Sequence, residues 1–257
     1  MPTHERRIEP CAGLRPWVSG YHLVWSPPGQ VYNLAHFPSG ESALVFRATG
    51  AGIGDLCAIG PFRRARYKRV CAASFYISVG LRPGRAREVL GWPLHELVDQ
   101  FVPLEDLWNS IGRTLRAQLI ESPPEFAVPL FEAAISRIVK RTKAGSASIV
   151  SRIVSAMDRD SDTSIDEHAR SAGLSCRQLR HLFRLELGMG PKHYSRIARL
   201  RRLLASARTK TSWVDLALES GFYDQAHMIR EFRDLLNAPP ETFLAGRVGG
   251  RNCSITE

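Results

Sequence analysis

A repeat in the C-terminal half constrains the fold of this chain more than any other feature. The segment GLSCRQLRHLF, residues 173 to 183, returns in outline as GFYDQAHMIREF, residues 221 to 232. Each copy opens on a glycine that follows a short helical pattern, and each continues as an amphipathic helix. A glycine supplies the left-handed residue in which a helix can stop. The order helix, tight turn, helix predicts two helix-turn-helix units.

Matched positions in the two copies have the same mechanical role. Ser164 and Ser212 each precede a helical pattern and have an acid three residues later, the spacing of a capping box, although Asp215 is a weaker partner than glutamate. Beyond the glycine the second copy needs one inserted residue, after which Gly188 matches Asn237. Asparagine tolerates a positive φ better than most residues, so we expect the second helix of each unit to end in a left-handed residue.

The alternative is a plain helical bundle built from a duplicated hairpin, and the second helix of each unit, the recognition helix, argues against it. The first recognition helix should turn basic side chains outward, with no acid before Glu186: Arg177, Arg180, His181 and Arg184. The second should turn long or forked donors outward: Gln225, His227 and Arg230. Such side chains match base edges in the major groove of DNA. The outward faces therefore favour DNA reading over scaffold.

A basic segment joins the two units. PKHYSRIARLRRLLASAR, residues 191 to 208, contains lysine and arginine but no acid. A helix of about 17 residues spans roughly 26 Å, which is of the same order as the roughly 34 Å between successive major-groove faces. One chain could then place both recognition helices on one side of a duplex. Some of these arginines must pack against neighbouring acids, so we expect only a subset to contact phosphate.

Composition agrees with a polyanionic partner and a reducing compartment. The formal net charge is +10 and the pI is near 9.8, which favours nucleic acid or an acidic surface. Five cysteines, at 11, 57, 71, 176 and 253, form no CxxC pair and suit free thiols in the cytoplasm. The first residues lack the apolar run of a signal peptide, and no run of about eighteen apolar residues occurs, so the sequence disfavours both secretion and membrane spanning.

The pattern along the chain predicts an α+β protein with two domains. Short β-branched and aromatic runs fill residues 16 to 79, and helical patterns follow from residue 83, including LHELVDQF and LEDLWNSIGRTLRAQLI. We expect a β-rich, barrel-like domain with a helical appendix in residues 1–143, a linker at 144–148, and an all-α domain in 149–257. Within the last, the predicted ranges are 164–187 for the first unit, 191–207 for the joining helix and 212–236 for the second unit.

Residues 148 to 246 resemble the DNA-binding domain of the AraC/XylS family of bacterial transcriptional regulators. The second unit is similar to the family's signature GF-x-D-Q-S-x-F-x-R-x-F-K-x-x-x-G-x-x-P, with Ala226, Met228, Arg233 and Asn237 as departures. The resemblance implies a set of base-contacting positions: Arg177, Arg180, His181, Gln225, Ala226, His227 and Arg230. The positions expected to contact phosphate are Ser175, Arg184, Lys192 and Arg233. Ser175 should also cap its recognition helix, whose amide groups favour phosphate.

The N-terminal half resembles the sensor region of one AraC-like subgroup. VGLRPGRA, residues 79 to 86, is similar to the subgroup phrase G-x-x-F-x-P-G-x-A, with Leu81 in place of the aromatic residue. The resemblance implies a small cupin-like barrel with an effector-binding or dimerising role. The expected partners are therefore double-stranded DNA, with RNA polymerase, an unidentified small-molecule effector and a second copy of the chain as further candidates.

No other motif predicts chemistry. GAGIGD lacks the lysine of a P-loop and is interpreted as a turn, and His22 and His36 stand alone, so we expect no metal, no cofactor and no catalytic residue. The basic run FRRARYKR, residues 62 to 69, is interpreted as a solvated strand or loop in preference to an anion site. The prediction is a sequence-specific transcriptional regulator and not an enzyme. A non-specific architectural DNA-binding protein, and less so an enzyme with a catalytic barrel and a DNA-binding module, are the alternatives.

Overall fold

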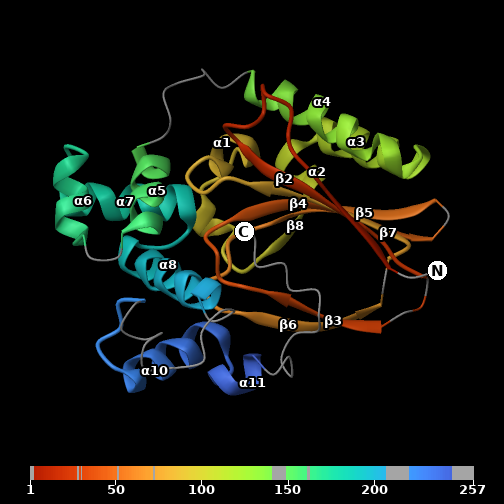
Figure 1. Ribbon diagram of the computed structural model, residues 1–257. Coiled ribbons are helices and arrows are strands. Elements are labelled where there is room, and N and C mark those ends of the chain that lie inside the picture. The colour runs from red at the N-terminus through yellow and green to blue at the C-terminus, as the bar shows by residue number, and fades with distance from the viewer. Residues whose placement is uncertain are drawn as a thin grey trace.

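The structure is a computed structural model that describes residues 3–27, 29, 31–50, 52–71, 73–140, 149–160, 163–206 and 220–244. Its N-terminal part is an antiparallel sheet in the order β1 (His4–Ile8), β2 (Val18–Trp25), β7 (Phe75–Leu81), β4 (Ser42–Gly50), β5 (Ile53–Ile59) and β8 (Phe101–Pro103). A second, two-stranded sheet is formed by β3 (Val31–His36) and β6 (Arg66–Cys71) and lies across from it (Figure 1). The two sheets give the expected barrel-like domain.

The large sheet has one apolar face and one mixed face. Along β7, Phe75, Ile77 and Val79 are buried and alternate with half-buried Tyr76 and Ser78. Because successive side chains of a strand point to opposite faces, this alternation separates a hydrophobic core from a polar interior. The apolar face is covered by the helical appendix, and the mixed face looks toward β3 and β6 (Figure 1).

The appendix follows β7 along the chain. It comprises α1 (Ala86–Leu90), a 3₁₀ turn η1 (Leu94–Glu96), α2 (Leu104–Trp108), α3 (Ser110–Glu121), a 3₁₀ turn η2 (Pro124–Phe126) and α4 (Ala127–Val139). The buried residues of α3 and α4 belong to the same core as the apolar sheet face, including Leu115, Phe131 and Ile135. These helices therefore complete the N-terminal core.

One helical prediction in the appendix is wrong, and a second is confirmed with a break in the helix. The pattern LHELVDQF forms only the η1 turn before the chain enters β8, where Phe101 pairs with Ile59 of β5. Asp99 has φ 59°, which interrupts any helix there. The single pattern from 104 to 120 is broken into α2 and α3 at Asn109, whose φ is 52°. In both places tertiary pairing or a backbone turn overrides the local helical period.

The C-terminal part is helical. It comprises α5 (Ile149–Arg159), α6 (Ile165–Ser171), α7 (Cys176–Leu187), α8 (Pro191–Ser206), α10 (Gln225–Leu236) and α11 (Pro240–Leu244). One hydrophobic core joins these helices, with Leu179, Phe183, Tyr194 and Phe232 fully buried. The predicted linker at 144–148 and the first helix of the second unit, expected from Ser212, lie outside the described residues.

Candidate nucleic-acid interface

The first helix-turn-helix unit consists of α6, a glycine turn and α7. Ser164 caps α6 in a capping box: its hydroxyl accepts from the Glu167 N–H at 3.2 Å, and its own N–H donates to the Glu167 carboxylate at 2.8 Å. Gly173 has φ 68°. Ser175 forms a second box with Gln178 at the start of α7, as predicted for the cap of the recognition helix. Local sequence thus sets the beginning of both helices.

The outward face of α7 is positively charged. Its predicted base and phosphate positions are all exposed: Arg177, Arg180, His181 and Arg184. Among the described residues none of these four has an acidic side chain within ion-pair distance. The acid of this helix, Glu186, instead points to the N-terminal domain, where Arg87 donates to its carboxylate at 3.0 Å. Burial raises the pKa of Glu186, and the Arg87 hydrogen bond opposes that rise.

The second recognition helix is α10, and its turn contains one more residue than the first. Gly221 has φ 76°, and Asp224 caps α10 by accepting from the His227 N–H at 2.5 Å. In the first unit the cap comes two residues after the glycine, and here it comes three residues after it. Tyr223 lies in this longer turn with 87% of its surface exposed. Sequence reasoning placed an insertion here but did not single out this aromatic side chain.

The predicted contacts of α10 divide into two groups. Gln225, Ala226 and Arg230 are exposed and available to a partner. His227 is half-buried and helps to shape the turn: its ring lies edge-on to Phe222 with centroids 5.6 Å apart, and its Nδ1 accepts from the Tyr223 N–H at 3.5 Å. The helix ends at Asn237 with φ 52°, which matches Gly188 at φ 71° and confirms the expected left-handed ends.

The arginines of α8 pack largely against the protein, as expected. Arg196 forms ion pairs with Glu231, at 2.7 Å, and with Asp234. The Arg196 hydrogen bond holds the pKa of Asp234 below its usual range. Arg199 lies over the Phe222 ring at 5.5 Å from its centroid. Lys192, the predicted phosphate contact at the start of α8, is exposed.

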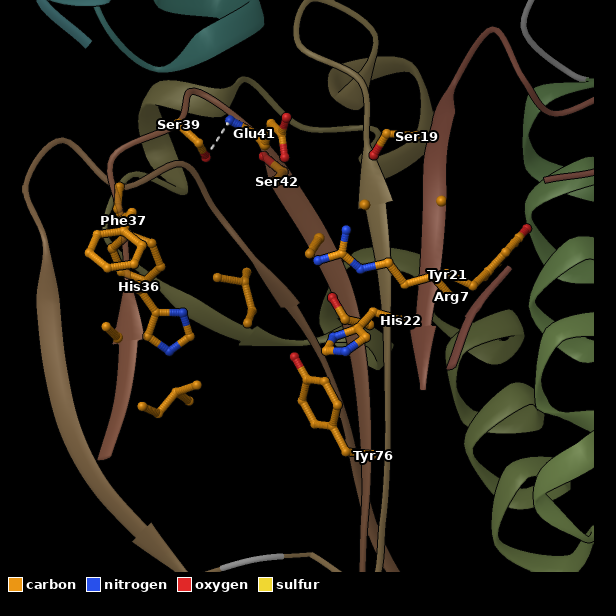
Figure 2. Close-up of a pocket in the computed structure, with 18 of the residues that line it drawn as sticks. Arg7, Ser19, Tyr21, His22, His36, Phe37, Ser39, Glu41, Ser42 and Tyr76 are labelled. Carbon is orange, nitrogen blue, oxygen red and sulfur yellow. Dashed lines mark hydrogen bonds between the residues drawn. The ribbon is translucent and has the colours of Figure 1, made fainter. Parts of the chain in front are cut away.

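A cavity of about 640 Å³ lies between the two sheets and is bounded on one side by α8 and the end of α10. His36 and Phe37 stand on one side of it, and His22 and Tyr76 stand across from them (Figure 2). The C-terminal domain contributes Leu200, Arg201, Leu204 and Leu236 to its wall. The size is that of ordinary small-molecule sites. The sequence analysis did not predict this interior, although alternating buried and half-buried residues along β2 and β7 are a signal for it.

Two polar groups in the described part of the cavity wall lack a hydrogen-bond partner from the protein. Burial, aided by Lys68 and Arg66, lowers the pKa of His36 to about 4, so its imidazole is neutral at physiological pH. Among the described residues, His36 Nε2 and the Ser42 hydroxyl are buried without a hydrogen-bond partner. Burial also raises the pKa of Glu41. Unpaired buried polar atoms cost free energy, so this wall favours an occupant that can hydrogen-bond to it.

Neither a metal-binding cluster nor a membrane-spanning helix occurs within the described ranges. No group of three histidine, cysteine or acidic side chains there is arranged to hold a metal ion. No helix in that part of the chain is long and apolar enough to cross a membrane.

Comparison with known proteins gives two family matches and a group of similar folds. Residues 168–246 match a helix-turn-helix domain, and residues 6–103 match a domain of unknown function. No curated protein matches the chain. Solved structures of ToxT from Vibrio cholerae are 10% identical; one covers 95% of this chain and 97% of its own with TM-score 0.44. Another, with bound unsaturated fatty acid, covers 87% of this chain and 94% of its own with TM-score 0.43.

The helix-turn-helix match defines the class of the C-terminal domain. Together with the capped helices and left-handed turns, it makes residues 168–246 a helix-turn-helix domain of the AraC type. This domain supports a DNA-binding transcription regulator, and an antiparallel β-sheet domain precedes it in the chain. The resemblance seen in the sequence of the C-terminal domain is thereby confirmed.

Proposed function

We propose that this chain regulates transcription by reading a specific DNA sequence with α7 and α10 in successive major grooves. The observation that carries the proposal is the pair of capped helices whose outward polar side chains have no acidic partner among the described residues: Arg177, Arg180, His181, Gln225 and Arg230. Forked and long donors of this kind pair with guanine and adenine edges. Ala226 and His227 complete the proposed base-reading set, with His227 acting mainly through the shape of the turn.

Phosphate contacts would give affinity and register. We assign them to Ser175, Arg184, Lys192 and Arg233, all of which are exposed. The first amide groups of α7, which begins at the Ser175 cap, have no partner within the helix, and such groups attract phosphate. Base contacts would then determine sequence specificity, and the phosphate contacts would supply most of the affinity.

We propose further that an occupant of the cavity modulates DNA binding. The cavity wall combines strands of the N-terminal domain with Leu200, Arg201 and Leu204 of α8, the helix that joins the two reading units. A small molecule there would therefore contact both domains at once. The proposed setting is the cytoplasm, with RNA polymerase and a second copy of the chain as further partners.

Replacing Arg180 by alanine tests the assignment of base reading. We expect a loss of about 1 to 3 kcal/mol on the cognate site, with relaxed preference at one base position, because a forked donor to a base edge is removed. The measurement is a binding titration against the cognate site, its single-base variants and random DNA. Arg184→Ala is the matched control and should weaken binding to all sequences alike. Equal loss on random and cognate DNA for Arg180→Ala would show that Arg180 contacts only phosphate.

A further inference from the structure

We propose that residues 60–67, the loop from β5 into β6, form a strap that connects the cavity to both helix-turn-helix units. This inference rests on the proposed function, because it names the route by which an occupant of the cavity would act on the reading helices. The strap contains most of the basic run FRRARYKR, residues 62 to 69, which the sequence alone predicted to be solvated.

One side of the strap forms part of the cavity wall. Gly60 and Phe62 line the cavity, and the Phe62 ring, 4% exposed, stacks on the His36 imidazole at 4.9 Å between centroids. The base of the strap is held by backbone hydrogen bonds to the segment before β8. The Gly60 N–H donates to the Gln100 carbonyl at 3.1 Å, and the Asp99 N–H donates to the Pro61 carbonyl at 3.1 Å. An occupant that displaces the cavity wall would therefore displace the strap at Phe62.

The other side of the strap contacts the first reading unit and the joining helix. A β-carbon added to Gly188, at the end of α7, would lie 3.0 Å from the Pro61 side chain and 2.8 Å from the Leu94 carbonyl oxygen. The end of α7 in the C-terminal domain therefore lies in close contact with the N-terminal domain. One residue after Phe62, the Arg63 carbonyl accepts a hydrogen bond from His193 Nε2 of α8 at 3.0 Å. The strap thus contacts the end of the first recognition helix and the beginning of α8.

The end of the second recognition helix is capped by the strap. The last carbonyl groups of a helix have no partner within the helix. Here the Ala65 N–H donates to the Leu235 carbonyl at 2.7 Å, and the Tyr67 hydroxyl donates to the Leu236 carbonyl at 2.6 Å. Ala65 is 1% exposed and belongs to the hydrophobic core of the C-terminal domain. The N-terminal domain therefore supplies hydrogen-bond donors that complete α10.

Asn237 explains why this chain departs from the glycine of the family signature. Its φ of 52° would suit glycine equally, but its side-chain amide donates to the Ala65 carbonyl at 2.8 Å. The Arg64 guanidinium adds an ion pair to Asp234 in the last turn of α10. With these contacts, both the N–H and the carbonyl of Ala65 are bound to the second recognition helix. The geometry fits a device that fixes α7, α8 and α10 through one short segment.

The test perturbs the cavity side of the strap in the full chain and measures hydrogen exchange on the other side. Phe62→Leu should speed exchange about tenfold in the last turn of α10 and the beginning of α8, since loosening the strap weakens hydrogen bonds there. Phe46→Leu is the matched control: Phe46 is 1% exposed but lies on the appendix face of the sheet. It should change exchange only within the N-terminal core. Unchanged exchange in α10 for Phe62→Leu would overturn the strap.

A second variant approaches the same contact from the C-terminal domain. Asn237→Gly keeps a left-handed helix end but removes the amide that binds Ala65. It should speed exchange of the Ala65 N–H about tenfold and leave α6 unchanged. An equal Ala65 rate in wild type and variant would contradict the proposal.

A DNA-binding measurement on the same variants distinguishes a failure of the strap proposal from a failure of the proposed function. Genomic fragments are competed against bulk DNA for wild type and Phe62→Leu. Faster hydrogen exchange in α10 for Phe62→Leu, without any preferred DNA fragment, would leave the strap standing and refute sequence-specific regulation. A preferred fragment with unchanged hydrogen exchange in α10 for Phe62→Leu would refute the strap and leave sequence-specific regulation standing. Coupled exchange together with a fragment preference that falls in Phe62→Leu is the expected result.

Discussion

Raising the salt concentration from about 50 to about 200 mM is expected to weaken DNA binding roughly 10³- to 10⁵-fold if about six to ten phosphates are neutralised. The physical reason is the release of counterions when fixed cations replace them. The described part of the chain offers such cations on one set of helices, all exposed: Arg177, Arg180, Arg184, Lys192, Arg230 and Arg233. None of them has an acidic partner within ion-pair distance among the described residues.

The measurement is the slope of log affinity against log salt concentration. Arg184→Ala should reduce the magnitude of the slope by about one, because one phosphate contact is lost. Arg113→Ala is the control, since Arg113 is exposed on α3 of the appendix. Its slope should equal that of wild type. A slope near zero for the wild type would exclude these helices as the phosphate-binding surface.

Replacing Gly188 by alanine is expected to lower the free energy of unfolding by about 2 to 4 kcal/mol, combining left-handed backbone strain with overpacking. Gly188 has φ 71°, and its added β-carbon would lie 2.5 Å from a Val98 methyl and 2.8 Å from the Leu94 carbonyl oxygen. These atoms belong to the N-terminal domain. The variant therefore strains the helix end and the contact between domains at the same time.

Gly173→Ala separates these two effects. Gly173 has nearly the same backbone, with φ 68°, but an added β-carbon there would meet nothing within 4 Å. It should cost only the strain of a left-handed alanine, about 1 to 2 kcal/mol. Denaturant unfolding of both variants, followed by circular dichroism, measures the difference. Equal losses would mean that the N-terminal domain does not press against the end of α7.

The sequence predicted the parts of the interface that depend on near neighbours. Ser164 and Ser175 cap helices through residues three positions away, and Gly173 and Gly221 turn the chain without help from distant groups. Such features can be predicted from the sequence because helix caps and turns depend on residues close in the chain. The insertion between the two copies also has a local cause, the longer turn that contains Tyr223.

The contacts between domains were not predictable in this way. Ala65 lies in a basic run whose charged members, such as Arg66 and Lys68, are exposed, and nothing in the run itself marks its alanine as a core residue. Its partners, Leu235 and Asn237, come from the far end of the chain. The Asn237 side chain looked like a tolerated substitute for glycine, and its hydrogen bond appears only when the two domains are placed together.

The cavity could be predicted from the sequence only in part. Residues 75 to 81 were predicted only as part of a β-rich region, although Tyr76 and Ser78 of β7 are interleaved with apolar residues and so give the strand one polar face. Whether that face met solvent or an enclosed space depended on the second sheet and on α8, which no local pattern specifies. The contact of Leu204 of α8 with the interior of the N-terminal domain therefore could not be predicted from sequence.

Competition between genomic DNA fragments and bulk DNA tests the central claim most directly. Fragments retained by the full chain at about 150 mM salt should bind at least about 10³-fold more tightly than bulk DNA. The protected sites should contain two sequence elements about one helical turn apart, one for α7 and one for α10. A ratio near one, with no shared pair of elements, would contradict sequence-specific reading and favour a non-specific architectural role.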